Sequence, residues 1–189
     1  LSCLLIAAAA FLTYEYSMKN PAKDTSVFKE DTTPVLSLPS SAEEEKSIQP
    51  FAVKAEVVLD YFDGKDSKVD SMTKFEGVYR ANQGMDYSFN KEAFDVLASF
   101  SGEVSDVKED NIFGKSVTIT SKDLSITYQS LSDITVKKGD KVNQKDPIAK
   151  AGSNIYNKEL GNHLHIVVEK NGKIIDPELM YGKTNAEIK

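Results

Sequence analysis

The sequence is poor in cysteine and in positive charge, and both shortages restrict what the protein can be. Its single cysteine, Cys3, cannot form a disulfide within the chain. The 23 Lys and Arg residues are outnumbered by 29 Asp and Glu residues, which gives a formal net charge of −6. No basic stripe is visible, so nucleic acids and anionic lipid surfaces are disfavoured as partners. With 189 residues and 40% apolar content, the chain suits one globular domain plus an additional segment.

The first 49 residues lack the patterns of a folded domain. The apolar stretch over residues 1–12 is shorter than the ~20 residues that cross a bilayer, and Tyr14 and Tyr16 follow it where an interfacial aromatic belt is expected. We therefore expect residues 1–18 to be the C-terminal part of a transmembrane anchor, with a signal-peptide core as the alternative. Residues 19–49 are rich in Pro, Ser, Thr and acidic residues, which predicts a flexible linker.

No long stretch shows helical periodicity, whereas alternation of apolar and polar residues begins near residue 50. The run FAVKAEVVL predicts a strand over residues 51–59, and TKFEGVYR (residues 73–80) alternates again. Between them, Asp63-Gly64 is typical of a turn. Further strands are expected at residues 94–99, 115–120, 124–129, 164–170 and 173–175. We predict a mostly β domain over residues 50–182, with N-terminal extension strands, followed by a tail over residues 183–189.

The chain has only two histidines, His163 and His165, and they stand two residues apart in GNHLHIVVEK (residues 161–170). On a strand, side chains at i and i+2 point to the same side, so the two imidazoles should project together. Such a pair often holds a catalytic metal, although an isolated H-x-H is more often a polar pair on a solvated face. Leu164 lies between them and should point into the core in either case.

Five segments together resemble a known family. They are NQGMDYSF, YQSLS, VKKGDKVNQKDPIAKAG, GNHLHIVVE and IIDP, which lie between residues 82 and 177. In order and spacing they resemble the LytM or lysostaphin-type zinc endopeptidases of bacterial cell walls. The resemblance implies a LytM-like β-sheet domain, here behind an N-terminal anchor and a polar linker. In that family the motifs are H-x-G-x-D, Y-x-H and H-x-H, which supply three zinc ligands and two catalytic histidines.

Two of the five family positions carry other residues in this sequence. Asp86 and His165 match zinc ligands and His163 matches a catalytic histidine, but Asn82 and Ser130 stand where the remaining ligand and catalytic histidines should be. Catalytic zinc needs three protein ligands, and an amide is a poor zinc donor. A serine cannot replace imidazole as a proton shuttle near neutral pH. We therefore predict no catalytic and no metal-binding residues, only vestigial positions, and no cofactor unless the altered site still binds zinc.

The combination of anchor, linker and incomplete zinc site resembles the sporulation branch of this family in endospore-forming bacteria. The resemblance implies a single-pass forespore membrane protein whose domain lies in the intermembrane space. There it would dock stage III sporulation protein AH, or an equivalent mother-cell membrane protein, in a channel or zipper that serves engulfment and forespore gene expression; an oligomeric ring is a further implication.

Two other functions stay open from the sequence. One is a zinc-dependent peptidoglycan endopeptidase, and the other is a peptidoglycan-binding module. For the second, Tyr128, Tyr156 and Tyr181 are candidate groove residues, with positions in the core as the alternative. A biotinyl or lipoyl carrier is disfavoured, because the lysine in SKDL (residues 121–124) lacks the setting of an attachment site.

Overall fold

The computed structural model of the chain describes residues 45–64 and 71–189. The expected anchor (residues 1–18) and the expected linker as far as residue 44 lie outside the described residues. Within the described residues, no helix has the length and the apolar character needed to cross a membrane.

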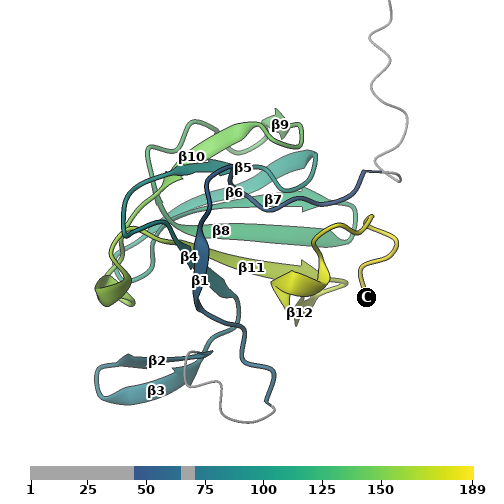
Figure 1. Cartoon of the computed structure of the whole chain (residues 1–189). Helices are drawn as coiled ribbons and strands as arrows, with labels where there is room; N and C mark the ends of the chain where they lie inside the picture. The colour runs from purple at the N-terminus through teal and green to yellow at the C-terminus, as the bar shows by residue number, and fades with distance from the viewer. Residues whose placement is uncertain (1–44, 65–70) are drawn as a thin grey trace, which may run out of the picture. The chain divides into compact units, whose positions relative to one another are not determined.

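The regular secondary structure of the described residues is almost entirely β-strand, as predicted (Figure 1). A ten-stranded sheet contains the path β1-β4-β11-β8-β7-β6-β9, and β5, β10 and β12 pair off this path. Its strands are β1 (Glu56–Leu59), β4 (Met85–Ser88), β5 (Asp95–Leu97), β6 (Gly102–Asp110), β7 (Gly114–Ser121), β8 (Leu124–Ser132), β9 (Lys141–Val142), β10 (Pro147–Ala151), β11 (Leu164–Lys170) and β12 (Lys173–Ile175). A separate hairpin consists of β2 (Met72–Phe75) and β3 (Val78–Ala81), and the short 3-10 turns are η2 (Lys158–Leu160) and η3 (Pro177–Leu179).

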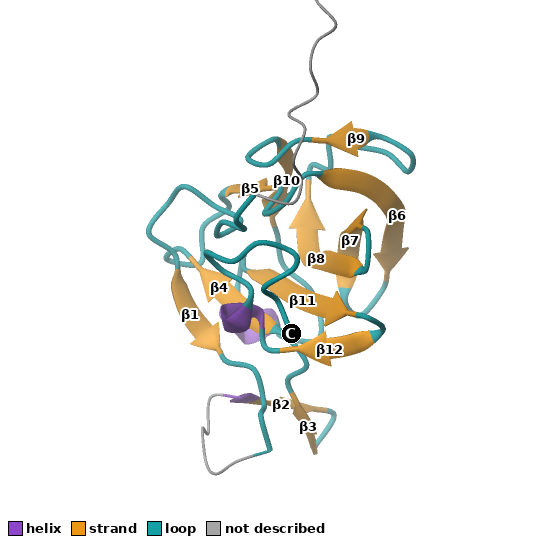
Figure 2. Cartoon of the chain, turned by 90° about the vertical axis from the view of Figure 1, so that its right-hand side faces the viewer, coloured by secondary structure: helices purple, strands orange, loops and turns teal. Residues whose placement is uncertain are grey.

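The central strands β8 and β11 supply much of the core and fix the position of the histidines. They run side by side and antiparallel (Figure 2), with Ile166 opposite Tyr128 and His165 opposite Gln129. Leu164 and Ile166 are fully buried, which confirms the inward direction predicted for Leu164. Because side chains alternate along a strand, the same burial turns His165 toward the opposite face.

Two strand predictions near the start of the domain are wrong. The strand expected over residues 51–59 is limited to β1, and Val57, one of the alternating apolar residues of that run, is 45% exposed. Among the strands of residues 45–64 and 71–189, β1 pairs only with β4, and its register shifts at a bulge between Val57 and Leu59. Phe51 is buried outside any strand, where its ring packs 5.0 Å from that of Tyr87.

The segment TKFEGVYR is a hairpin rather than one strand. Glu76 and Gly77 both have positive φ, 51° and 80°, and they connect β2 to β3 with Phe75 opposite Val78. A two-residue loop with positive φ at both positions is the type I′ turn, whose twist matches that of the two strands. The Glu76-Gly77 pair interrupts what looks like continuous alternation in the sequence.

Both ends of the expected domain extend beyond the predicted boundaries. Ser47, in the segment expected to be linker, is 3% exposed, and its backbone nitrogen donates to the carbonyl of Lys183 at 2.9 Å. In the expected tail, Asn185 and Ile188 are buried. The two terminal segments therefore pack against each other and against the sheet.

A buried lysine holds the C-terminal segment. Lys170, at the end of β11, is 8% exposed, and its Nζ donates to Asp123 Oδ1 at 2.8 Å, to the backbone carbonyl of Asn185 at 2.8 Å and to Asn185 Oδ1. An ammonium group so deeply placed requires such acceptors. Its contacts join the β7–β8 turn, β11 and residue 185.

The lysine contacts predict a measurable stability loss. Replacing Lys170 with Met should lower the free energy of unfolding by about 2 kcal/mol, because buried acceptors on Asn185 lose their donor. Urea unfolding of the full chain measures this, with Lys173→Met, at an exposed position of β12, as the matched control. Equal stability of the two variants would contradict the role given to Lys170.

Candidate functional site

The two histidines converge on one carboxylate. His165 lies on β11 opposite Asp86 on β4, and its Nδ1 is 3.0 Å from Asp86 Oδ2. His163 lies one residue before β11, and its Nε2 is 3.7 Å from Asp86 Oδ1. The i, i+2 spacing thus places both imidazoles on the side where β4 presents Asp86.

Gly84 permits this close approach. A Cβ at residue 84 would lie 2.2 Å from the carbonyl oxygen of Ile166 and 2.9 Å from Cε1 of the His165 imidazole. Neither the strand backbone nor the imidazole can give way without breaking the contact with Asp86. The glycine of the NQGMD segment is therefore explained by packing of residue 84 against β11.

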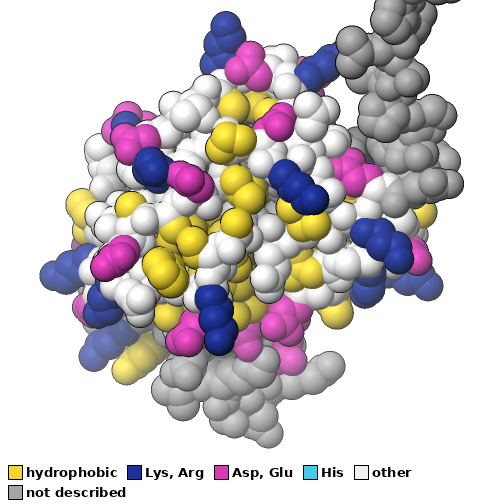
Figure 3. All heavy atoms as spheres, turned by 45° about the horizontal axis from the view of Figure 1, so that its top comes forward, with side chains coloured by type: hydrophobic (Ala, Val, Ile, Leu, Met, Phe, Trp, Pro, Cys, Tyr) yellow, Lys and Arg dark blue, Asp and Glu magenta, His cyan; other side chains and the backbone are white. Residues whose placement is uncertain are grey.

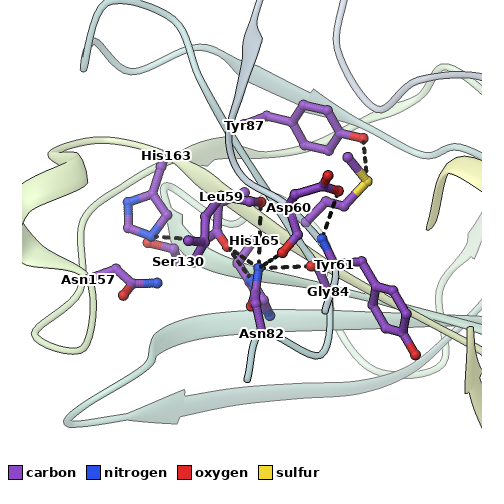
Figure 4. A network of polar contacts seen from close by, with 12 residues as sticks. Leu59, Asp60, Tyr61, Asn82, Gly84, Tyr87, Ser130, Asn157, His163 and His165 are labelled. Atoms are coloured by element: carbon purple, nitrogen blue, oxygen red, sulfur yellow. Dashed lines mark hydrogen bonds and ion pairs between the residues drawn. The ribbon is translucent and has the colours of Figure 1, made fainter. Parts of the chain in front are cut away.

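Asn82 is the second group bonded to Asp86. Its side-chain Nδ2 is 3.0 Å from Asp86 Oδ2, 2.8 Å from the Gly84 carbonyl, 3.1 Å from the Asp60 carbonyl and 3.5 Å from the Leu59 carbonyl (Figure 4). All four neighbours are hydrogen-bond acceptors, which settles which end of the amide carries the nitrogen. Asn82 therefore acts as a donor to the end of β1 and to β4.

Asp86 itself has no exposed surface. Its Oδ2 accepts two hydrogen bonds, from the Asn82 amide and the His165 imidazole, while Oδ1 accepts none from the described residues. Burial of a carboxylate is unfavourable unless donors or cations compensate it. The compensation here consists of the two N–H groups on Oδ2.

The two histidines have opposite pKa shifts. Burial lowers the pKa of His163 and outweighs the charge of Asp86. Its Nδ1 lies 2.8 Å from the Gly161 carbonyl, which must accept, so Nε2 is left without a proton in the neutral ring. Burial also lowers the pKa of His165, but the charge of Asp86 and the direct hydrogen bond raise it further, so the net shift is upward. His165 is thus the imidazole whose cationic form Asp86 stabilises.

Ser130 is not directed at the carboxylate. It is fully buried, and its hydroxyl donates at 3.2 Å to the carbonyl of Gly152. The same carbonyl accepts from the backbone nitrogen of His163 at 2.8 Å. The residue adopts a positive φ of 63° within β8. Ser130 therefore supports the backbone beneath His163 and offers no proton-transfer group to the site.

The residues present do not fit a catalytic zinc ion. Asp86 and His165 provide two of the three protein ligands that such an ion requires, and Asn82 directs N–H donors, not a lone pair, at the shared Asp86 oxygen. Across residues 45–64 and 71–189, no group of three or more His, Cys, Asp or Glu side chains is placed to hold a metal ion.

A cleft of about 580 Å³ opens beside this cluster. Its wall is rich in carboxamides, and His165 lines it as well. The carboxamide residues are Asn82, Gln83, Gln129, Asn154 and Asn157. Such a lining can exchange hydrogen bonds with an uncharged polar ligand. Apart from Asn82, these residues were not predicted, because they come from segments far apart in the sequence and stand at none of the five ligand or catalytic positions of the family motifs.

Of the three tyrosines considered for a groove, only Tyr156 lines the cleft. Its ring lies 5.1 Å from that of Phe75 on the β2–β3 hairpin and 4.9 Å from that of Phe113 in the β6–β7 turn. Tyr128 is a core residue whose hydroxyl accepts from the backbone nitrogen of Ser99, and Tyr181 bonds to Tyr87. The groove interpretation of Tyr128 and Tyr181 is therefore wrong.

Comparison with known proteins places these features in a family. Residues 80–177 match the family model described as Peptidase family M23. Stage II sporulation protein Q of Bacillus subtilis (strain 168) is 36% identical over 115 residues, which are 60% of this chain and 41% of that protein. The match thus spans about two fifths of the length of that relative.

Solved structures agree on the fold. A chain of the SpoIIQ–SpoIIIAH pore-forming complex superposes with a TM-score of 0.72 and 31% identity, covering 76% of this chain and 96% of that chain. A zinc-containing peptidase from Vibrio cholerae gives a TM-score of 0.57 at 22% identity, covering 70% of this chain and 39% of that one, and shows the shared fold alone. The predicted LytM-like β domain is therefore confirmed.

The opposite pKa shifts predict opposite pH dependences for two variants. The raised pKa of folded His165 gives stability that is present below its ordinary value of 6.5 and is lost as the pH rises through the folded value. The lowered pKa of His163 means that its imidazole is harder to protonate in the folded chain than in the unfolded chain. The contribution of His163 to the free energy of unfolding therefore becomes more favourable as the pH rises.

His165→Gln should therefore destabilise the chain more at about pH 5 than at about pH 8, and His163→Gln should do the reverse. Urea unfolding in the presence of a chelator at both pH values measures the difference. If the loss of unfolding free energy changed with pH in the same direction for both variants, the opposite pKa shifts given to His163 and His165 would be wrong.

Proposed function

This chain belongs to peptidase family M23, and we propose that it is a non-hydrolytic member that assembles a protein complex between two membranes during sporulation. Its β domain would dock stage III sporulation protein AH, or an equivalent protein of the mother-cell membrane. The anchor proposed for residues 1–18 would hold it in the forespore membrane as a single-pass protein, with the domain in the intermembrane space.

One observation carries the non-hydrolytic part of the proposal. The Asn82 amide and the His165 imidazole both place nitrogen 3.0 Å from the same oxygen of Asp86. In a zinc hydrolase, the metal must be held by three protein groups so that its bound water loses a proton near neutral pH. A carboxylate whose Oδ2 already accepts two hydrogen bonds, beside an amide that cannot replace imidazole, does not supply such a centre.

The second catalytic position supports the same conclusion. Ser130 has a hydroxyl whose ordinary chemistry does not shuttle protons near pH 7, and it is buried and bonded to the Gly152 carbonyl. Without a metal to activate water and without a second imidazole, peptide-bond hydrolysis lacks both its nucleophile and its proton transfer. All five positions, Asn82, Asp86, Ser130, His163 and His165, are therefore proposed to be vestigial.

The docking part of the proposal depends on the relatives. Stage II sporulation protein Q is 36% identical over the matched region, and SpoIIQ is present with SpoIIIAH in a solved pore-forming complex. The match covers 96% of the chain in that complex, so nearly all of its fold has a counterpart in this chain. That complex is described as pore-forming, which favours an oligomeric ring for this chain as well.

The face of the domain in Figure 3 suits a protein partner better than nucleic acid. On the face in Figure 3, lysine and arginine side chains alternate with aspartate and glutamate side chains around apolar groups. Nucleic-acid binding requires a continuous positive surface, which this face does not present.

A second candidate function is binding of peptidoglycan without cleavage. The observation in its favour is the cleft of five carboxamide side chains beside His165, with Tyr156 and Phe113 in its wall. Carboxamides and aromatic faces can hold the polar chain of a glycan or a peptide by hydrogen bonds and stacking. Such binding would be compatible with docking.

The test combines binding and cleavage in one preparation. We expect the full chain in detergent to bind the soluble domain of the mother-cell partner with a dissociation constant of about 10 μM or tighter, unchanged by EDTA. In a muropeptide assay with added zinc, it should release no product above a blank. Calorimetry measures binding, and chromatography of the digest measures cleavage.

The double variant Asn82→His with Ser130→His is the matched control, because it restores both family histidines. It should take up zinc where the natural chain does not. Zinc-dependent cleavage by the natural chain would contradict the non-hydrolytic proposal, and absence of partner binding would contradict the docking proposal.

A further inference from the structure

The Asn82 side chain has more acceptors around it than an amide nitrogen can serve, and this points to a role beyond the loss of a metal ligand. Nδ2 carries two hydrogens, yet four oxygens lie within 3.5 Å of it. The shortest distances are to Gly84 and Asp86, with Asp60 close behind. The nitrogen therefore occupies a small cage of oxygens at the junction of several segments.

The main chain of Asn82 joins the same junction. Its backbone nitrogen donates to the carbonyl of Ser71 at 2.9 Å, and its carbonyl accepts from the backbone nitrogen of Phe62 at 2.9 Å. Side chain and main chain together connect the end of β1 and residues 60–62, the residue before β2, and β4. His165 adds β11 through the shared oxygen of Asp86.

We infer that the Asn82 carboxamide is a metal-independent cross-link, which joins the end of β1, β4 and β11 around the buried Asp86 carboxylate in place of a divalent cation. A cation placed between oxygen and nitrogen ligands neutralises a buried carboxylate and fixes the strands that carry the ligands. Here two polarised N–H groups on one carboxylate oxygen perform both tasks. The end of β1, β4 and β11 are then held together without a metal ion.

Because all four atoms around Asn82 Nδ2 are oxygen acceptors, residue 82 must supply a hydrogen-bond donor. An aspartate at residue 82 has the same shape but would place an acceptor among three carbonyl oxygens and the Asp86 carboxylate. Like charges at hydrogen-bonding distance in a buried site are strongly unfavourable, unless a cation enters between them. With zinc present, the carboxylates of residues 82 and 86 and the His165 imidazole would form a three-ligand set.

The experiment is thermal unfolding of the full chain in EDTA and in excess zinc. The natural chain should unfold at the same Tm in both. Asn82→Asp should lower the Tm by about 5 to 10 °C in EDTA, and zinc should recover part of this loss. Gln83→Glu is the matched control, since it makes the same amide-to-carboxylate change at an exposed neighbouring residue, and it should leave the Tm unchanged in both conditions.

Two results would overturn the inference. One is a Tm of the natural chain that falls in EDTA or rises with zinc, and the other is an Asn82→Asp variant as stable in EDTA as Gln83→Glu. If Asn82→Asp does not fold in EDTA, Asn82→Ala decides the question, because a Tm equal to that of Gln83→Ala would show that the amide holds nothing together. The cross-link does not depend on partner docking, so a failed docking experiment leaves this inference standing, and the reverse also holds.

Discussion

A carboxylate with no access to solvent sets the conditions for the rest of the site. Asp86 projects from β4 against β11, and whatever surrounds it must compensate a buried charge that is otherwise unfavourable by several kcal/mol. The Asn82 amide and the His165 imidazole supply that compensation through one oxygen, and His163 approaches the other. The upward pKa shift of His165, the placement of the β3–β4 connection and the misfit of this cluster to a zinc ion all follow from this arrangement.

The sheet holds this cluster without needing a catalytic centre. Leu164 and Ile166 are fixed in the core against β8, so His165 between them is forced toward Asp86. Gly84 leaves room for the contact. A site built on such rigid strands can exchange its metal ligand for an amide while the core remains intact. Family membership alone therefore fixes the fold and not the reaction.

Part of this structure could be predicted from the sequence, and the physical reason differs between elements. Strands β7, β8, β11 and β12 were found because apolar residues alternate along them or because clear turns bound them. β6 was missed because most of its length is charged or polar, as suits a strand near the edge of a sheet. β4 was missed although MDYS alternates apolar and polar residues, because it has only four residues and its polar side chains, Asp86 and Ser88, are as buried as its apolar ones. The resemblance to LytM-type peptidases located Asn82, Asp86 and the histidines, but neither the hydrogen bonds of Asn82 nor the carboxamide cleft has a sequence signal.

The most direct measurement is on the Asn82 side-chain amide itself, by nuclear magnetic resonance of the nitrogen-15-labelled chain at neutral pH. If the amide compensates Asp86, its two protons should be inequivalent and protected from exchange with water, and stoichiometric zinc should leave the signal in place. An Asn82 amide that exchanges freely, or that moves to a new position when one equivalent of zinc is added, would contradict a carboxylate held by N–H donors alone.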